Sequence, residues 1–249
     1  MPTGYTALPK VYDRWQQTYG KDFSSLILPR LLLAIRHYRI PKSTMLDLAC
    51  GTGTLAVMMA KRGWKVWGID ASEGMVAESV KKLVGSDKVV KFLHQDMRQF
   101  ILPSQVILTT CFFDSLNHLL TKKDLLRTFR AVHKALLPHG YFIFDVSNEL
   151  CYKSLWMRTE TIDHKDFTLV LKNNYNPNSH LGRSDVELSF SNGSFNNQCT
   201  ETVYERYFDN EEINELLHKV GFHLLQRDDF NFTRMQKVGK IKTWWVVQK

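Results

Sequence analysis

The sequence lacks the long apolar runs and the signal pattern that mark membrane and secreted proteins. No apolar stretch reaches the roughly 18–20 residues that a membrane-spanning helix needs, because the longest candidate, residues 26–40, contains Pro29, Arg30 and Arg36. The N-terminus MPTGYTALPK has no charged segment followed by an apolar one, so it does not resemble a signal peptide. We therefore expect a cytoplasmic protein that has no membrane partner.

Paired cysteines are absent as well. The four cysteines lie far apart, at positions 50, 111, 151 and 199, and form no CxxC pair. We expect them to be free thiols in a reducing compartment, and we expect no metal site. Basic residues outnumber acidic ones by 33 to 25, a net charge of +8, but they are spread along the chain. We favour a solvated surface over an RNA-binding patch, and keep a nucleic-acid partner as the alternative.

What the sequence does contain is a regular alternation of strands and helices over its first 150 residues. Helical patterns lie between short apolar segments, and such an alternation forms a parallel sheet with helices on both faces. The predicted strands are residues 45–49, 65–69, 88–93, 105–111 and 140–146. The predicted helices are residues 54–62, 73–84 and 122–136.

The pattern changes after residue 150. Apolar and polar residues alternate between turn signals over residues 157–208, which predicts an antiparallel meander. Asp209 and Glu212 form a capping pattern for a helix, and two more strands complete the chain. The first 40 residues have a helical pattern, with Pro29 as a break or a helix start. We therefore predict a helical cap, a core, a β-rich insert and a C-terminal completion of the core sheet, at residues 1–40, 41–150, 151–208 and 209–249.

A glycine-containing turn follows the first predicted strand and opens a helix. It reads LDLACGTG, with glycines at positions 51 and 53 that permit conformations closed to other residues and let a ligand approach the backbone. Asp70 ends the second strand and can accept both ribose hydroxyls of an adenosine. Asp96 and Met97 follow the third strand, where they suit an adenine amine and an adenine ring. The ends of successive parallel strands meet at one crevice, so we expect an adenosine-containing ligand there.

Asp47 decides between two cofactor classes. Nicotinamide cofactors also use glycine turns, but Ala56 stands in the place of their third glycine. A carboxylate at position 47 would repel a pyrophosphate. S-adenosylmethionine has no phosphate and carries an amino group that a carboxylate suits. We therefore prefer S-adenosylmethionine and keep NAD-dependent oxidoreduction as a distant alternative.

These motifs, together with GIDAS, HQDMRQF and the segment CFFDSLNHLLTKKDLLRTFRAVHKALLPHGYFIFDV, resemble the successive motifs of class I S-adenosylmethionine-dependent methyltransferases. The segments DSLNHL and YDRWQQTYGKDF and the insert resemble small-molecule N-methyltransferases of the amino-sugar and glycine types. The resemblance implies a Rossmann-like, doubly wound sheet of seven strands, mostly parallel with the last strand antiparallel, and the antiparallel β insert beside it.

The resemblance also implies which residues hold the cofactor. Residues of the turn border the methionine end, Asp70 the ribose and Asp96 with Met97 the adenine, while the end of the fourth strand borders the sulfonium and N-terminal tyrosines fold over the cofactor. The implied cofactor-binding residues are Tyr12, Tyr19, Asp47, Ala49, Gly51, Gly53, Asp70, Ala71, Met75, Asp96, Met97, Cys111 and Phe112.

The predicted activity is in-line transfer of a methyl group to a small-molecule acceptor, favouring an amine nitrogen, with S-adenosylhomocysteine as product. His118 is the candidate base or acceptor-orienting group, and Tyr19 is a second catalytic candidate. Asp114 and Arg206 are candidate substrate contacts, each with a helix cap or a surface salt bridge as its structural alternative. The insert is placed to cover the substrate mouth or to form an oligomer contact such as a homodimer. An RNA or protein methyltransferase and a non-catalytic S-adenosylmethionine-binding protein remain the alternatives.

Overall fold

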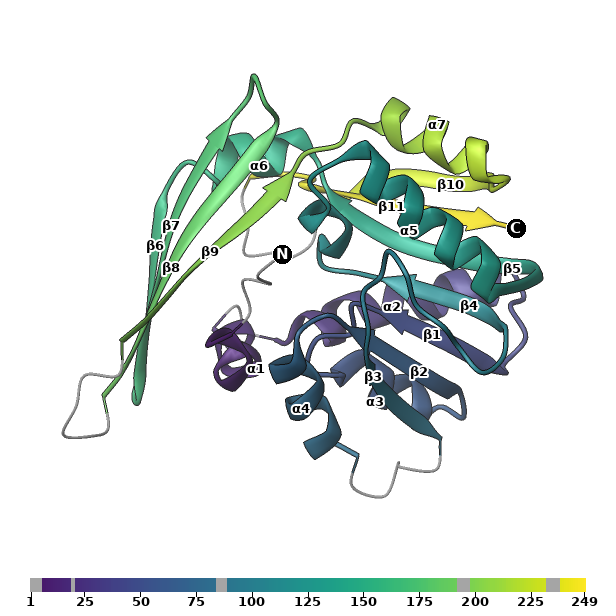
Figure 1. Cartoon of the computed structure of the whole chain (residues 1–249), viewed down its shortest axis with the longest axis horizontal. Helices are drawn as coiled ribbons and strands as arrows, with labels where there is room; N and C mark the ends of the chain where they lie inside the picture. Colours follow the sequence, from purple (N-terminus) through teal and green to yellow (C-terminus); the bar gives the residue numbers. More distant parts are fainter. Residues whose placement is uncertain (1–5, 19–20, 84–88, 192–197, 232–237) are drawn as a thin grey trace.

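A seven-stranded sheet is the centre of the computed structural model, which describes residues 6–18, 21–83, 89–191, 198–231 and 238–249 (Figure 1). Within these residues the strand order is β10-β11-β5-β4-β1-β2-β3. The strands from β1 to β5 run parallel, and β11 runs antiparallel to both of its neighbours. The strands are β1 (Thr44–Leu48), β2 (Lys65–Asp70), β3 (Val90–His94), β4 (Val106–Cys111), β5 (Leu136–Ser147), β10 (His223–Phe230) and β11 (Lys242–Gln248).

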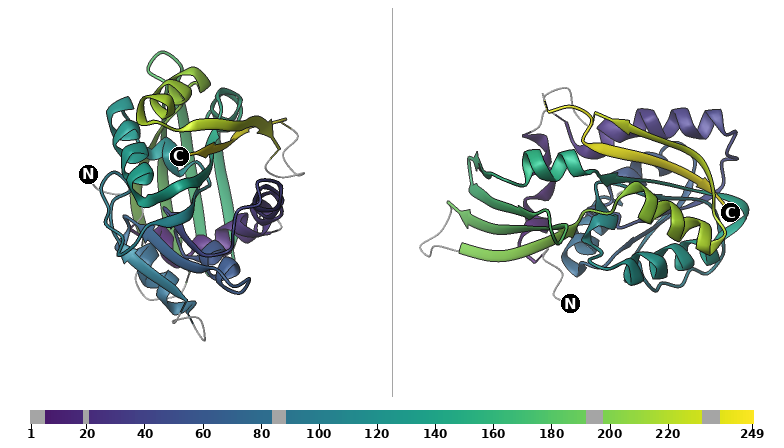
Figure 2. Two further views of the ribbon diagram at one scale, coloured as in Figure 1. Left: turned by 90° about the vertical axis from the view of Figure 1, so that its right-hand side faces the viewer. Right: turned by 90° about the horizontal axis from the view of Figure 1, so that it is seen from above.

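Helices cover both faces of this sheet, as the view from above shows (Figure 2). None of the helices in the described part of the chain combines the length and the apolar character needed to cross a membrane. The helical elements are η1 (Leu8–Lys10), α1 (Tyr12–Gln17), α2 (Phe23–His37), α3 (Thr54–Ala60), α4 (Glu73–Lys81), η2 (Ser115–His118), α5 (Lys122–Ala135), α6 (Glu149–Leu155) and α7 (Asn210–Val220).

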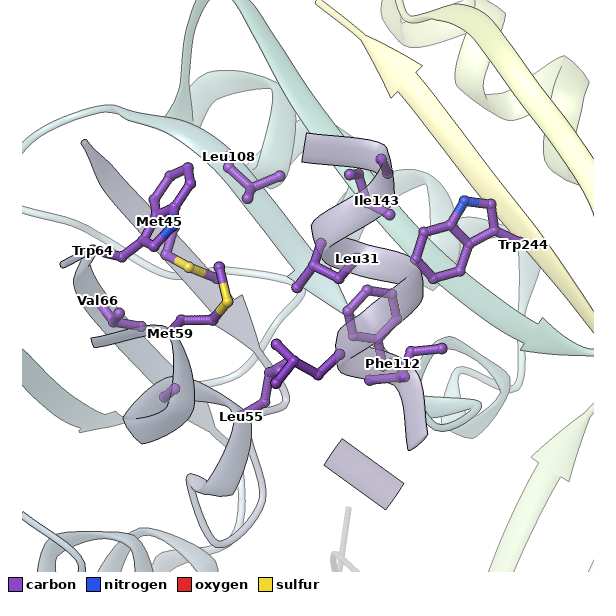
Figure 3. Packing of buried hydrophobic residues seen from close by; sticks show 14 of the residues in the cluster. Leu31, Met45, Leu55, Met59, Trp64, Val66, Leu108, Phe112, Ile143 and Trp244 are labelled. Carbon is purple, nitrogen blue, oxygen red and sulfur yellow. The ribbon is translucent and has the colours of Figure 1, made fainter. Parts of the chain in front are cut away.

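The core has two layers because neighbouring residues of a strand point to opposite faces of the sheet. Met45 of β1 packs in the layer under α2 and α3, whereas the next residue, Leu46, packs under α5 and α7. Figure 3 shows the first layer, in which Leu31 of α2 lies among strand side chains that include Ile143 and Trp244. This burial of apolar side chains on both faces fixes the strand ends that form the site.

The insert is a second sheet beside the core. Four antiparallel strands of the described chain follow one another in the order β6-β7-β8-β9. Leu8 and Val11 of the N-terminal segment pack on one face of it, and α1 lies between the two sheets (Figure 1). The strands are β6 (Thr159–His164), β7 (Phe167–Asn176), β8 (Leu181–Phe190) and β9 (Gln198–Arg206).

The predicted fold class is confirmed, and so is the capping box of α7, in which Asp209 and Glu212 each bond the other's backbone N–H. Two local predictions differ. Pro29 neither breaks nor starts a helix but lies inside α2, because burial of neighbours such as Leu28 outweighs the lost hydrogen bond. Helix α6 was not predicted, although Asn148 caps it by accepting the Cys151 N–H at 3.2 Å.

Replacing Leu31 by alanine tests the first core layer. Leu31 is fully buried, so Leu31→Ala should lower the free energy of unfolding by about 2–5 kcal/mol. Leu33 lies on the same helix and is 67% exposed, so Leu33→Ala should cost less than about 0.5 kcal/mol. Urea unfolding of both variants measures the difference, and equal costs would contradict the assigned buried face of α2.

Candidate active site

The turn after β1 approaches the ligand crevice with its backbone. Gly51 and Gly53 have φ angles of 55° and 74°, in the left-handed region that favours glycine. A Cβ on Gly53 would lie 2.4 Å from the Phe92 ring, so this position accepts no side chain. A Cβ on Gly51 would meet only Tyr12 within van der Waals range, at 3.9 Å. The turn is therefore packed against the core at Gly53, whereas at Gly51 it faces Tyr12.

Asp70 ties this turn to the next strand end. Its two carboxylate oxygens accept the backbone N–H groups of Gly51 and Ser72, each at 2.8 Å. Burial raises the pKa of Asp70, and these hydrogen bonds counteract part of that shift because they favour the ionised form. The carboxylate is thus fixed in orientation at the rim of the sheet.

A cavity of about 720 Å³ opens beside Asp70. It brings together residues from the ends of four parallel strands, from α1 and from the insert. The predicted residues that line it are Tyr12, Ala49, Gly51, Asp70, Ala71, Met75, Asp96, Met97 and His118. Residues that the sequence analysis did not single out also line it, among them Ser72, His94, Gln95, Arg98, Phe113, Ser115, Leu119, Thr202, Val203 and Tyr204. Four of these additional residues, Ser72, His94, Gln95 and Arg98, belong to the GIDAS and HQDMRQF motifs. Their position beside the predicted Asp70 and Asp96 was the sequence signal that could have identified them.

Several predicted cofactor residues lie outside this cavity. Asp47 points into the sheet, where its Oδ1 accepts the Thr110 hydroxyl at 2.8 Å. Gly53 packs against Phe92, as described above. Cys111 is fully buried, and the Phe112 ring stacks on Trp244 with centroids 5.3 Å apart. These four residues shape the site from behind, through the backbone or the core.

Two residues just after β4 line the cavities: Phe113, and Asp114, which was predicted as a substrate contact. Phe113 and Asp114 have positive φ angles of 63° and 55°, so the chain turns sharply after β4. Both oxygens of the buried Asp145 accept the N–H groups of these residues, at 3.1 Å and 2.9 Å. Since positive φ is costly for non-glycine residues, the Asp145 bonds hold the turn in place.

Lys242 of β11 neutralises this turn. Its Nζ lies 2.9 Å from Asp114 Oδ2 and 3.5 Å from Asp145 Oδ1, and its side chain is 6% exposed. Burial alone would raise the pKa of Asp114, but Lys242 and the Ser147 hydroxyl outweigh it and hold that pKa below its usual range. Asp114 is therefore an ionised group with a fixed countercharge.

Of the remaining predicted residues, two do not meet a cavity that the structure describes. Tyr19 falls outside the described residues. Arg206 lines neither described cavity, because its guanidinium lies 3.4 Å from Glu212 and 4.9 Å from the centroid of the Phe208 ring. In this structure Arg206 joins the insert to α7, and its contact with substrate stays a prediction.

A second, smaller cavity of about 200 Å³ adjoins the first. The two share Tyr12, Phe113 and Val203 as lining residues. The second lies between the core and the insert, and its wall combines aromatic rings with carboxyl groups, of which that of Glu205 is buried. Its other lining residues include Trp15, Phe23, Asp114, Trp156, Arg158, Glu160, Asn173, Glu205 and Lys242.

Two comparisons connect this geometry with known sequences. Residues 45–140 match a family model described as a methyltransferase domain. The putative methyltransferase YqeM of Bacillus subtilis is 33% identical over 185 residues, which span 74% of each chain. The chain belongs to the methyltransferase family. Its predicted enzyme class, S-adenosylmethionine-dependent methyltransferase, and its cofactor are confirmed accordingly.

Other relatives of this methyltransferase extend the comparison. A dTDP-3-amino-3,6-dideoxy-α-D-glucopyranose N,N-dimethyltransferase of Streptomyces fradiae is 30% identical over 139 residues, 55% of this chain and 52% of the relative. A solved S-adenosylmethionine-dependent methyltransferase of Clostridium acetobutylicum is 23% identical, with a TM-score of 0.76 over 91% of this chain and 90% of that one. At that identity the second likeness supports the fold alone.

The residues present fit the cofactor of this family. The Asp70 carboxylate is already oriented by two backbone N–H groups, which leaves further acceptor sites for ribose hydroxyls. Met97 and Asp96 lie at the end of β3 on the same cavity, where Arg98 donates to both Asp96 oxygens at 3.0 Å. When bound, S-adenosylmethionine supplies an activated methyl group on a sulfonium.

Replacing Asp70 tests the ribose assignment. Asp70→Asn should weaken S-adenosylmethionine binding by roughly 10- to 100-fold, because hydrogen bonds to a charged acceptor contribute about 1.5–3 kcal/mol. Asp163→Asn, on the exposed edge strand β6, is the matched control and should leave affinity unchanged. Calorimetric titration measures both. An Asp70→Asn protein with wild-type affinity would show that the ribose is held elsewhere.

Asp47 makes stability depend on pH. Burial raises its pKa to about 7, although the Thr110 bond favours ionisation. The unfolded chain ionises this group near pH 4 and the folded protein near pH 7, so the contribution of Asp47 to folding is most favourable below pH 4 and falls as pH rises to about 7. Asp47→Asn removes this dependence.

We expect Asp47→Asn to gain stability relative to wild type, without cofactor, by roughly 2 kcal/mol more at pH 8 than at pH 5. Urea unfolding at the two pH values measures this difference. If the variant and the wild type differ by the same amount at both pH values, the Asp47 carboxyl is not the group that titrates.

Proposed function

We propose that this methyltransferase acts on the amino nitrogen of a small molecule, with an amino sugar as the substrate class. The observation that carries the proposal is the second cavity, which adjoins the cofactor cavity and presents the buried carboxyl group of Glu205 and the partly exposed carboxylate of Asp114. Carboxyl groups in an enclosed site favour a cationic or hydrogen-bond-donating acceptor. The dimethyltransferase of Streptomyces fradiae, whose name gives an amino sugar, supports the same class.

The aromatic walls agree with an ammonium acceptor. Trp15, Phe23 and Trp156 line the second cavity, and a cation near an aromatic face is attracted by the ring electrons. Aromatic faces also pack against the apolar face of a sugar ring. The cavity has about 200 Å³ against about 720 Å³ for the cofactor cavity, so it suits a compact acceptor rather than a nucleic-acid strand.

Alignment is the main contribution we assign to the chain. Tyr12 and Phe113 stand at the junction of the two cavities, where an acceptor nitrogen and the cofactor's methyl group would meet. Holding two reactants in one geometry converts a bimolecular reaction into a nearly unimolecular one. His118 lies on the cofactor side of this junction, with Nδ1 3.3 Å from the carbonyl oxygen of Tyr204. Because a carbonyl only accepts, the proton belongs on Nδ1, and Nε2 is free of its proton.

We assign the N-terminal cap and the insert to enclosing the site. Asp13 of α1 accepts the Thr52 hydroxyl and pairs with Lys82, both at 2.5 Å, on the cofactor side. The next residue, Arg14, pairs with Asp166 of the insert. Helix α1 is thus held from both sides above the junction of the cavities.

The test is turnover on a matched pair of acceptors. We expect S-adenosylhomocysteine to form with dTDP-3-amino-3,6-dideoxy-α-D-glucopyranose and not with its counterpart carrying a hydroxyl at carbon 3, because only the amine complements the carboxyl groups. Chromatography of the products measures both reactions. Transfer to the hydroxyl compound, or to RNA alone, would contradict an amine acceptor. Cofactor binding without turnover on any acceptor would favour a non-catalytic role.

A further inference from the structure

Glu205 is a buried carboxyl group that the insert contributes to the second cavity. The residue lies on β9 and is 6% exposed. The Tyr152 hydroxyl donates a hydrogen bond to its Oε2 at 2.9 Å, and its Oε1 lies 3.7 Å from His118 Nε2. A carboxyl group in such surroundings costs free energy unless a partner offsets its burial. Its position on the cavity wall therefore calls for an explanation beyond packing.

Asp114 and Glu205 differ in their countercharge, and together with Glu160 they are the acidic residues that line this cavity. Asp114 has Lys242 at 2.9 Å and the Ser147 hydroxyl at 2.8 Å. The titratable and charged groups around Glu205 are Tyr152, His118, Cys151, Asp114 and Lys242. Lys242 already serves Asp114 and Asp145. Burial first, and then the charge of Asp114, raise the pKa of Glu205 well above its usual range. Glu205 therefore has a stronger tendency than Asp114 to hold a proton.

We propose that Glu205 is the catalytic residue that takes the proton from the acceptor's nitrogen. The inference rests on the proposed function, an amine acceptor. In this step an N–H bond of the ammonium breaks, its electron pair stays on the nitrogen, and the proton passes to an ionised Glu205 oxygen. The products are a neutral amine, whose lone pair is free to form the new C–N bond, and a neutral carboxyl group.

His118 gives this proton a way out of the cavity. Its ring is partly exposed, and its unprotonated Nε2 faces Glu205 across 3.7 Å. Burial lowers the pKa of His118, so the ring is neutral and able to accept near neutral pH. A carboxyl group with a raised pKa is also better matched to an amine than an ordinary glutamate, since proton transfer is most efficient between groups of similar pKa.

Glu205→Gln tests the proposal because glutamine keeps the shape and still accepts the Tyr152 hydrogen bond. With dTDP-3-amino-3,6-dideoxy-α-D-glucopyranose as the probe acceptor, we expect kcat to fall by about 10²- to 10⁴-fold. The acid limb of the wild-type profile of kcat against pH should disappear, while the Kd for S-adenosylmethionine stays within about twofold. Glu187→Gln, on the exposed side of β8, is the matched control and should keep the wild-type profile.

Tyr152→Phe tests the role of Glu205 through the pH dependence of kcat, which would not change if Glu205 had only a structural role. The Tyr152 hydroxyl stabilises the ionised carboxylate, so its loss should raise the pKa of Glu205 further. The acid limb of the kcat profile should shift to higher pH, with kcat recovering toward wild type on the alkaline side.

The outcomes separate the two proposals. A wild type that methylates the probe, together with a Glu205→Gln protein of unchanged kcat and pH profile, overturns the role of Glu205 and leaves the proposed function standing. A wild type that binds S-adenosylmethionine but methylates no amine overturns the proposed function and the role of Glu205 with it.

Discussion

The contact of Lys242 with Asp114 and Asp145 is the interaction on which the rest of the site depends. It joins the last strand of the sheet to β5 and to the turn after β4. Two carboxylates so close together, that of Asp145 fully buried, would repel each other, and the lysine offsets that repulsion. Asp145 is then free to hold Phe113 and Asp114 in their left-handed conformation. Without the cation, repulsion between Asp114 and Asp145 would destabilise the turn between the two cavities.

Both cavities are thus assembled around one short turn. Its Phe113 lines both cavities, while its Asp114 lines the second. The segments that complete the enclosure come from elsewhere: α1 precedes the core sheet, and β9 belongs to the insert. The fold combines a rigid sheet edge, which fixes directions, with appended segments, which fix size and polarity. This division agrees with the general finding that a fold hosts a site without dictating its chemistry.

Local sequence patterns predicted the parts of the site that are local in the chain. The turn around Gly51 and the carboxylate of Asp70 both follow strands whose apolar runs are evident, and both lie where the ends of parallel strands meet. At the end of β4 the predicted Cys111 and Phe112 are buried in the core, whereas Phe113, which was not singled out, and the predicted Asp114 line the cavities. A left-handed turn at non-glycine residues has no signature in composition or periodicity, so the sequence did not place Phe113 on the cavity wall.

The contributions from distant segments had no comparable signal. Lys242 lies 128 positions after Asp114, and as a sequence feature it belonged only to a small basic group near the C-terminus. Glu205 was one residue of an alternating strand, and alternation alone does not tell which face turns toward a cavity. Its neighbour Arg206, which was predicted as a substrate contact, forms an ion pair with Glu212 six residues later. These assignments depend on how the insert packs against the core, which only tertiary structure specifies.

Helix α1 has a consequence for the order in which ligands enter and leave. Through Asp13 it is bound to the cofactor side, through Arg14 to the insert, and Tyr12 between them lines both cavities. A displacement of α1 large enough to release the cofactor would also remove part of the wall of the second cavity, to which we assign the acceptor. Binding in the two cavities is therefore thermodynamically linked. If one ligand stabilises α1 in the position described here and so raises the affinity for the second ligand, the second raises the affinity for the first by the same factor.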